Sequence, residues 1–314
     1  MGKIAFVFPG QGAQKTGMGK DFYENSVRAR EAFETASRLL GFSMEELCFE
    51  KNERLDQTEY TQAALVTVSA AILTECAARG ITPDMAAGLS LGEYGALLAA
   101  DVMDYPDAVR VVRRRGILMQ EAVPLGQGTM AAVLGLPAEK IEEVLAAYLR
   151  EQAGKDGCVV IANDNCPGQV VISGRCPDVE AVLPLLKEAG ARRCVPLNVS
   201  GPFHSPLLAG AGEKLRDVLQ PVTIREPRIP YVANVHAEPV TSAAEVKELL
   251  CRQVSSPVLW RQSVMRMIAE GVDTFVEIGP GTTLTSFIRK IDRGQTVLHV
   301  GSWEDMEALE KALQ

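Results

Sequence analysis

The sequence predicts an α/β protein built on a parallel sheet, with a smaller unit inserted into it. Residues 4–8 form a continuous apolar run that ends at Pro9-Gly10, the pattern of a strand that is buried on both faces of a parallel sheet. Helical and strand patterns alternate after this run, as in other α/β proteins. Between residues 126 and 199 the pattern changes, which indicates a second unit.

The elements of the large part follow one another along the chain. Helices are expected at 23–40, 62–79, 91–100 and 106–123, and strands at 4–8, 85–88, 229–235 and 274–278. The inserted part has the order strand, helix, strand, strand, helix, strand, which is that of a ferredoxin-like unit. Its elements are expected at 129–135, 139–150, 158–162, 169–173, 179–189 and 192–199.

These patterns divide the chain into two domains. We place the large domain at residues 1–125 and 200–314 and the inserted domain at residues 126–199. An inserted domain leaves and re-enters its host at neighbouring points, so the residues beside the two crossings should face a common cleft.

Composition excludes several classes of partner. The net charge of -8 disfavours nucleic acid and anionic membrane surfaces, because phosphate binding requires a basic face. The longest apolar stretch, 63–73, falls short of the roughly 20 residues of a membrane span. The seven cysteines contain no C-x-x-C pair, which fits neither a disulfide framework nor a zinc site. We therefore expect reduced thiols, a cytoplasmic protein and no metal.

The sharpest local signal is the G-x-S-x-G pattern from Gly88 to Gly92, between an expected strand and an expected helix. A serine on such a turn exposes its hydroxyl, and the next backbone N–H, that of Leu91, points at a developing oxyanion. The alternative is that Ser90 merely caps a helix. The strand-to-helix context favours a nucleophile.

A serine nucleophile needs a base, and the chain has only three histidines. His299 lies in an apolar run and is expected to be satisfied in a strand, whereas His236 is expected to cap a surface turn. His204 follows Gly201-Pro202-Phe203 at the second domain crossing, which puts it at the predicted cleft. The alternative for His204 is a loop histidine bonded to backbone.

Arg115 belongs to the apolar stripe of its helix, because it lies three residues after Val112 and four before Met119. An inward arginine requires an anion, either a substrate carboxylate or an internal acidic residue. Arg113 and Arg114 fall on other faces and are expected to be solvated.

The loop after the first strand resembles a dinucleotide fingerprint but lacks its third glycine, which is Lys15. It could instead supply a second oxyanion donor at Gln11, beside Leu91.

Seven segments together carry a family resemblance. They are Phe8-Pro-Gly-Gln-Gly-Ala-Gln14, Gly88-Leu-Ser-Leu-Gly-Glu93, Arg115-Gly-Ile-Leu-Met-Gln120, Asn163-Asp-Asn-Cys-Pro-Gly-Gln169, Gly201-Pro-Phe-His-Ser205, Gln253-Val-Ser-Ser-Pro257 and Glu277-Ile-Gly-Pro-Gly281. In order and spacing the chain resembles the malonyl-CoA:acyl carrier protein transacylases nearly end to end. The resemblance implies a split α/β-hydrolase-like domain with an inserted ferredoxin-like domain.

The resemblance also implies roles for individual residues. Ser90 would be the nucleophile, His204 the base and Arg115 the clamp for the malonyl carboxylate. Gln11 and Leu91 would form the oxyanion hole, and the main-chain carbonyl of Gln253 would orient the histidine. Substrate positioning is expected of Asn163, Asn165 and Met119. Phe203 matches the form associated with malonyl groups, whereas Leu89 departs from the frequent histidine before the nucleophile.

The activity implied is transfer of malonyl from malonyl-CoA to the phosphopantetheine thiol of acyl carrier protein, by a ping-pong mechanism and with no bound cofactor. This transfer would supply fatty acid chain elongation. The carrier is acidic and transient, so a local basic patch should meet it; Arg192-Arg193 and Arg289-Lys290 with Arg293 are candidates. A monomer is expected. The alternatives are a serine esterase or thioesterase, a trans-acting polyketide acyltransferase and a non-catalytic acyl-binding protein.

Overall fold

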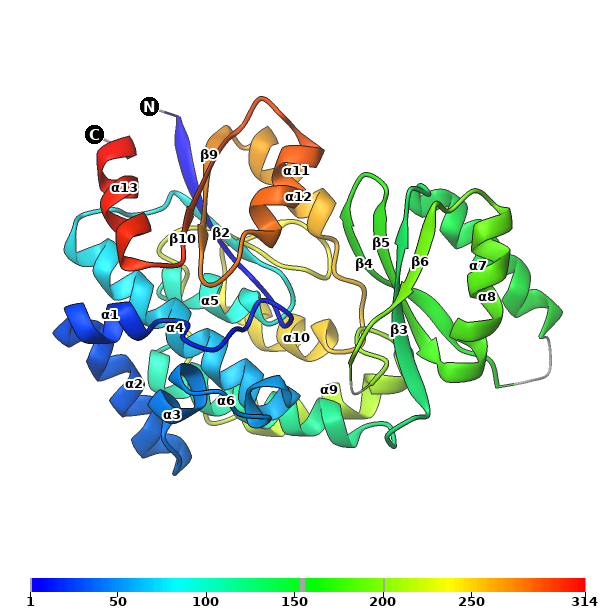
Figure 1. The fold of residues 1–314 in the computed structure, drawn as a ribbon, viewed down its shortest axis with the longest axis horizontal. Helices are drawn as coiled ribbons and strands as arrows, with labels where there is room; N and C mark the ends of the chain where they lie inside the picture. Colours follow the sequence, from blue (N-terminus) through cyan, green and yellow to red (C-terminus); the bar gives the residue numbers. More distant parts are fainter. Residues whose placement is uncertain (1, 153–155, 200, 314) are drawn as a thin grey trace.

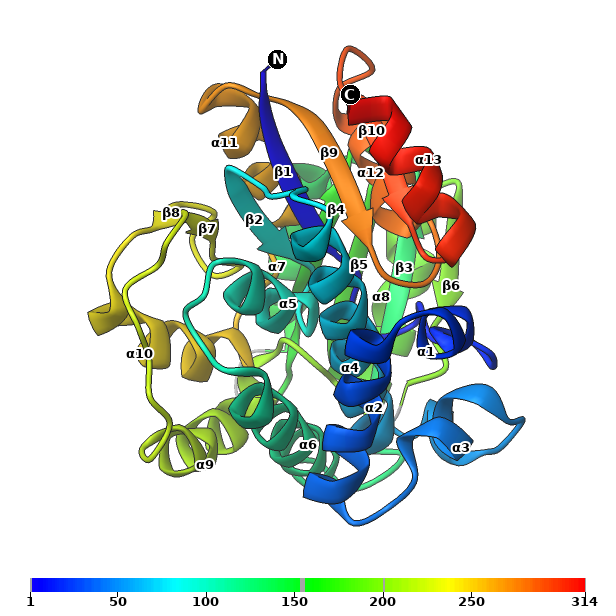
Figure 2. The same ribbon diagram turned by 90° about the vertical axis from the view of Figure 1, so that its left-hand side faces the viewer.

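The structure is a computed structural model that describes residues 2–152, 156–199 and 201–313. Two sheets organise the chain (Figure 1). The larger sheet has the strand order β10-β9-β1-β2-β7-β8, and its members are parallel except for β8, which runs antiparallel to β7. Its strands are β1 (Lys3–Phe8), β2 (Met85–Gly88), β7 (Tyr231–Val232), β8 (Pro239–Val240), β9 (Val272–Ile278) and β10 (Thr296–Val300). Figure 2 shows β2, β1, β9 and β10 side by side in this order.

Strand β1 is buried on both faces, as its apolar run predicts. Phe6 and Phe8 join the cluster that contains α4, α5 and α6. Ala5 and Val7 join a second cluster with α11 and α12 on the opposite face. Successive side chains of a strand point to opposite faces, so an unbroken apolar run is what a sheet covered by helices on both sides requires.

The second sheet is antiparallel, with the order β4-β5-β3-β6. It consists of β3 (Gly128–Leu134), β4 (Val159–Cys166), β5 (Gln169–Arg175) and β6 (Arg193–Pro196), and α7 (Ala138–Glu151) and α8 (Cys176–Glu188) cover its outer face (Figure 1). Along β3, Ala131 and Val133 pack under these helices, whereas Met130 and Ala132 face the other side. That uncovered face is turned toward the larger sheet.

The remaining helices surround the parallel sheet. They are α1 (Lys20–Asn25), α2 (Val27–Leu40), α3 (Met44–Phe49), α4 (Thr58–Ala78), α5 (Gly92–Ala99), α6 (Tyr105–Glu121), α9 (Ala209–Leu219), α10 (Ala243–Gln253), α11 (Trp260–Ala269), α12 (Thr283–Ile291) and α13 (Trp303–Leu313), with 3-10 turns at Arg54–Asp56 and Pro206–Leu208. By length and composition α4 could cross a membrane, yet 78% of its most apolar window is buried inside the protein, as in the core helix of a folded domain.

Several elements differ from the sequence prediction. The helix expected at 23–40 is two helices, because Ser26 leaves the helical conformation and its side chain caps α2 by accepting a hydrogen bond from Ala29 N–H. The strand expected at 229–235 is reduced to Tyr231–Val232, since the chain turns away there toward Asn234. β4 continues four residues beyond the expected end at 162. The periodic patterns did not predict α3 or the helices after residue 201.

The two crossings between the sheets are neighbours, as expected of an insertion. A Cβ on Gly128, at the start of β3, would lie 2.4 Å from the ring of Pro202 on the returning chain. Residue 200, at which the second segment of the large domain was placed, lies outside the described residues.

Candidate active site

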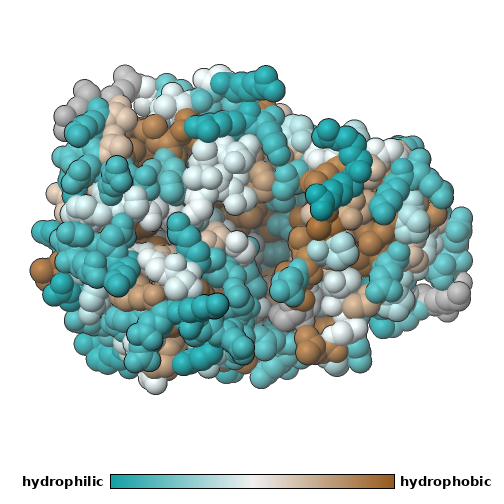
Figure 3. All heavy atoms as spheres, viewed as in Figure 1, coloured by the Kyte–Doolittle hydropathy of each residue, from teal (hydrophilic) through white to brown (hydrophobic). Residues whose placement is uncertain are grey.

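A cleft of about 260 Å³ opens between the two sheets. The loops after β1 and β2 line one side, and β3, β4 and β5 line the other. Figure 3 shows the surface hollowed at this junction. Ligands of open α/β sheets bind at the carboxyl ends of the strands, and this cleft lies at the carboxyl ends of β1 and β2.

Ser90 lies on a tight turn between β2 and α5, with φ 52°. The turn depends on glycine, because a Cβ on Gly92 would lie 2.0 Å from the Phe8 carbonyl oxygen. The Ser90 N–H donates to Oδ1 of Asn234 at 2.7 Å, which fixes the strained backbone. Leu91, not Ser90, is the N-cap residue of α5, so the helix-cap alternative for Ser90 is wrong.

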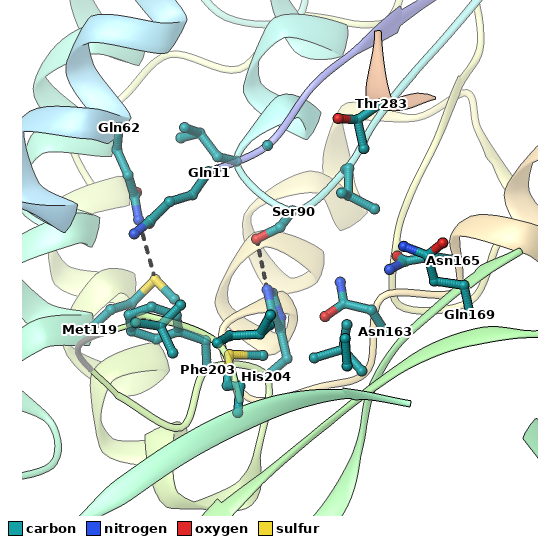
Figure 4. Close-up of a pocket in the computed structure, with 18 of the residues that line it drawn as sticks. Gln11, Gln62, Ser90, Met119, Asn163, Asn165, Gln169, Phe203, His204 and Thr283 are labelled. Atoms are coloured by element: carbon teal, nitrogen blue, oxygen red, sulfur yellow. Dashed lines mark hydrogen bonds between the residues drawn. The ribbon is translucent and has the colours of Figure 1, made fainter. Parts of the chain in front are cut away.

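His204 is the histidine that meets Ser90. The Ser90 Oγ lies 2.7 Å from His204 Nε2 (Figure 4). Nδ1 lies 2.9 Å from the Gln253 carbonyl and 3.1 Å from the Ser256 carbonyl. Carbonyl oxygens only accept hydrogen bonds, so Nδ1 carries the proton and Nε2 is left to accept the serine hydroxyl.

The electrostatic surroundings keep His204 neutral. Burial and the nearby charge of Arg115 lower the pKa of His204 to about 4, against the opposing effect of its two carbonyl partners. Because this value lies far below neutral pH, the imidazole can accept a proton from Ser90. The other two histidines lie elsewhere: His236 accepts the Glu238 N–H in a turn, and His299 pairs with the Gly279 carbonyl.

Arg115 is 1% exposed, as its position on the apolar stripe predicts. Nη1 donates to Gln62 Oε1 and Nη2 to Gln253 Oε1, both at 2.9 Å. Nη2 also donates to Ser90 Oγ at 3.2 Å. Among the described residues no carboxylate lies within 4.0 Å of its guanidinium, so the alternative of a direct internal salt bridge is wrong. Burial lowers the pKa of Arg115, and the negative charge of the buried Glu93 opposes that lowering.

The two arginines before Arg115 differ from each other. Arg114 is exposed, as expected. Arg113 is not solvated: its guanidinium pairs with Glu59 at 2.6 Å and stacks over the Tyr60 ring at 4.0 Å. The periodicity of the helix did not reveal these partners because they come from another helix, α4.

Gln11 and Leu91 flank Ser90 in the cleft. The side-chain amide of Gln11 donates to Thr58 Oγ1 at 3.1 Å, so it is held away from the Ser90 hydroxyl. In the parts of the chain described here, neither backbone N–H donates a hydrogen bond within the protein. Two free backbone donors next to a serine are what an oxyanion hole requires.

Comparison with known proteins shows the family of this chain. The acyl transferase domain family matches residues 5–307. The malonyl CoA-acyl carrier protein transacylase of Bacillus subtilis strain 168 is 46% identical, across 100% of this chain and 97% of the relative. The protein of the same name from Staphylococcus aureus strain MRSA252 is 41% identical, across 98% of each chain. The chain belongs to the malonyl CoA-acyl carrier protein transacylases.

Solved structures of malonyl-transferring enzymes have the same fold as this chain. An acyl carrier protein S-malonyltransferase from Vibrio cholerae superposes with a TM-score of 0.94 at 39% identity, covering 98% of this chain and 99% of its own. A malonyl-transacylase solved in complex with its type II PKS acyl-carrier protein has a TM-score of 0.94 at 36% identity, covering 99% of each chain.

Three further residues expected in this transacylase site also line the cleft. Asn163 and Asn165 lie on β4 and are nearly buried, and Oδ1 of Asn165 has no hydrogen-bond partner among the described residues. Met119 lies on α6, where its sulfur accepts a hydrogen bond from Gln62 Nε2 at 3.6 Å (Figure 4). Of these three residues, the two asparagines thus come from the small sheet and the methionine from the large part.

Sequence reasoning missed three polar residues behind the site: Gln62, Asn234 and the buried acid Glu93. Each is fully or almost fully buried and hydrogen-bonded to Ser90, Arg115 or Gln253. A polar residue in an otherwise apolar stretch was the available signal, since buried polar groups require partners. Within the described residues no group of three or more His, Cys, Asp or Glu could hold a metal ion.

Proposed function

We propose that the protein transfers a malonyl group from malonyl-CoA to the phosphopantetheine thiol of acyl carrier protein, through an ester on Ser90. One observation carries this proposal: a buried cation, Arg115, lies 3.2 Å from the same hydroxyl that lies 2.7 Å from His204. An acyl group with a free carboxylate has a use for that cation, and an uncharged acyl group has none.

The first half of the reaction loads the enzyme. Ser90 Oγ attacks the thioester carbonyl while its proton passes to His204 Nε2. The backbone N–H groups of Gln11 and Leu91 would hold the resulting oxyanion. The tetrahedral intermediate collapses with cleavage of the carbon–sulfur bond, and the CoA sulfur takes the proton from His204. A malonyl ester remains on Ser90.

The second half reverses these steps with a different thiol. The carrier's phosphopantetheine thiol gives its proton to His204 and attacks the ester carbonyl. When the intermediate collapses, the Ser90 oxygen leaves and recovers that proton. Arg115 would hold the malonyl carboxylate throughout, while Asn163, Asn165 and Met119 would position the acyl chain and the arm that carries it.

The orientation of His204 distinguishes this reaction from hydrolysis. A serine esterase or thioesterase is expected to place a carboxylate on Nδ1, whereas two neutral carbonyls, of Gln253 and Ser256, occupy that position here. Such an esterase also has no use for Arg115. A trans-acting polyketide acyltransferase would use the same residues. One similar solved structure is a malonyl-transacylase in complex with a type II PKS acyl-carrier protein, so supply of polyketide synthesis is the second candidate function.

The fold supports the same proposal at a finer level. We assign residues 1–125 and 200–314 to an α/β-hydrolase-like domain and residues 126–199 to a ferredoxin-like insertion. The serine turn between β2 and α5 supports the first assignment. The antiparallel order β4-β5-β3-β6 with two helices on one face supports the second. We further propose a cytoplasmic monomer without a bound cofactor, metal, membrane or nucleic acid partner.

The carrier should dock beside the cleft through positive charge. Lys290, on α12, donates to Gln169 at the rim of the cleft at 3.3 Å, so the cluster with Arg289 and Arg293 is favourably placed for an acidic partner. The pair Arg192-Arg193 lies at the start of β6, on the small sheet.

The proposed function predicts a stable adduct. On mixing with malonyl-CoA, mass spectrometry should find a malonyl group on Ser90 that persists and then discharges when phosphopantetheinylated acyl carrier protein is added. The Ser90→Ala variant should show no adduct. Rapid hydrolysis without carrier would indicate an esterase instead, and a parent protein without adduct would indicate a binding protein.

The pKa of His204 predicts the pH profile of loading. Because the folded-state pKa is lowered to about 4 from an ordinary value of 6.5, the base stays neutral as the pH falls from 8 to about 5. The kcat/KM for acylation by malonyl-CoA reports the free enzyme, so it should not fall as the pH is lowered from 6.5 to 5 and should fall by half near pH 4. A half-point near 6.5 would contradict the buried, neutral imidazole. Unfolded His204 takes up a proton near pH 6.5 and folded His204 only near pH 4, so the free energy of unfolding falls as the pH is lowered from 6.5 to 4. Folding must therefore be verified at each pH.

A further inference from the structure

The proposed function leaves one buried acid without a role. Glu93, on α5, is 0% exposed. Its Oε2 accepts two hydrogen bonds, from Asn234 N–H at 2.9 Å and from Gln253 Nε2 at 2.8 Å. Its Oε1 is buried and has no hydrogen-bond partner in the described part of the chain. A buried carboxylate with one unpaired oxygen is costly, so its presence requires a reason.

Both partners of Glu93 hold reacting groups in place. Asn234 accepts the Ser90 N–H and donates to the Gly88 carbonyl, each at 2.7 Å, so it fixes the nucleophile turn. Gln253 orients His204 through its main-chain carbonyl and Arg115 through its side chain. A single oxygen atom of Glu93, Oε2, therefore anchors both Asn234 and Gln253.

Glu93 is also connected to Arg115 by one amide. Arg115 Nη2 donates to Gln253 Oε1 at 2.9 Å, and the same amide donates through Nε2 to Glu93 at 2.8 Å. An amide between a cation and an anion is polarised by both and stabilises both. The other groups facing this pair are uncharged near neutral pH: burial lowers the pKa of His204 and raises the pKa values of Tyr94 and Tyr231.

We propose that Glu93 is a positioning residue that acts as the counter-charge of Arg115 in the empty site and takes up a proton when the substrate carboxylate binds Arg115. This inference rests on the proposed function, because it requires a substrate with a carboxylate. Two carboxylates around one cation in a desolvated site leave a net negative charge. Protonation of Glu93 by a proton from solvent removes this net negative charge.

The geometry allows that protonation without rearrangement. The unpartnered Oε1 can carry the proton, while Oε2 continues to accept from Asn234 and Gln253. Burial raises the pKa of Glu93 to about 7, against its two hydrogen bonds and the charge of Arg115. The acid is thus partly ionised at neutral pH, and a second carboxylate nearby would raise its pKa further.

Proton uptake can be measured directly. The Ser90→Ala protein, which cannot form the ester, is titrated with malonyl-CoA by calorimetry at pH 8 in two buffers of different ionisation enthalpy. We expect uptake of a large fraction of a proton, and none with acetyl-CoA, which lacks the carboxylate. The dissociation constant of malonyl-CoA should weaken about tenfold per pH unit above pH 7 and level off below pH 6. Absence of uptake would overturn the proposal.

Glu93→Gln in the same protein identifies the group. Its carbonyl oxygen can still accept from Asn234 and Gln253, but it has no charge and does not titrate. We expect proton uptake and the pH dependence of malonyl-CoA binding to disappear. Uptake that persists in this variant would assign the proton to another group and refute the role of Glu93.

If the Glu93→Gln variant does not fold, a second measurement tests the proposal. Infrared difference spectra of the Ser90→Ala protein should show the band of a buried, protonated carboxylic acid growing as malonyl-CoA is added and not growing with acetyl-CoA. Absence of that band also overturns the proposal. The Ser90 adduct is tested separately in the parent protein, so a failure of Glu93 and a failure of the transferase function are distinguishable.

Discussion

Replacing His204 with alanine is expected to slow acylation of Ser90 by about 10²–10⁴-fold, the range that general-base catalysis supplies. The Ser90 hydroxyl has its base at 2.7 Å, and no other histidine is near enough to replace it. Residual acylation should remain, because the backbone donors at Gln11 and Leu91 are untouched. Single-turnover mixing with malonyl-CoA, followed by mass spectrometry, measures the rate.

His236→Ala is the matched control for this prediction. His236 accepts a backbone hydrogen bond in a turn and does not line the cleft, so its loss should leave the acylation rate unchanged. An acylation rate in His204→Ala within a few-fold of the parent would contradict the role of His204 as base. The thermal transition of both variants shows whether a slow rate reflects lost folding instead.

The reactive turn could be predicted from the sequence because its causes are local. A short strand, a serine between glycines and a helix of small residues are visible within one window around Ser90. The structure gives the physical reason for the glycines, since a Cβ on Gly88 would lie 1.9 Å from the Gly92 carbonyl carbon. Arg115 could be placed inward for the same kind of reason, namely the period of its own helix.

The polar network behind the turn could not be predicted because its partners are distant in sequence. Asn234 is separated from Ser90 by 144 residues, and Gln253 from Glu93 by 160. A window of sequence shows that a residue is polar but not which buried group it satisfies. The same limit applies to Arg113: its position on the helix predicts a solvated charge, but it pairs with Glu59 on another helix.

Tertiary packing also overrode the strand prediction at residues 229–235. The sequence predicts a strand over these seven residues, but only Tyr231–Val232 pair with β2 and β8. The chain leaves the sheet directly afterwards and brings Asn234 under the Ser90 turn, where its side chain makes two hydrogen bonds of 2.7 Å. The shortened strand is therefore associated with the site, as departures from local rules often are.

The requirement for a cation in the acyl site predicts the behaviour of Arg115→Ala. The malonyl carboxylate would lose its partner in a buried site, which costs roughly 2–5 kcal/mol, or about thirty-fold and more in kcat/KM for malonyl-CoA. Transfer of acetyl groups, which make no use of the guanidinium, should fall less. The ratio of kcat/KM for malonyl-CoA to that for acetyl-CoA is the quantity to measure, because it does not depend on the fraction of folded enzyme.

Arg114→Ala provides the matched control for that ratio, since Arg114 is the exposed neighbour on the same helix. Its ratio should equal that of the parent. Arg115→Ala also leaves the carbonyl oxygens of Gln62 and Gln253 without their donor, so some stability is lost as well. That loss lowers both rates equally and leaves the ratio unchanged, whereas loss of the carboxylate clamp lowers kcat/KM for malonyl-CoA more than for acetyl-CoA and so changes the ratio. An Arg115→Ala enzyme that keeps the parental ratio would show that the cation does not select the substrate.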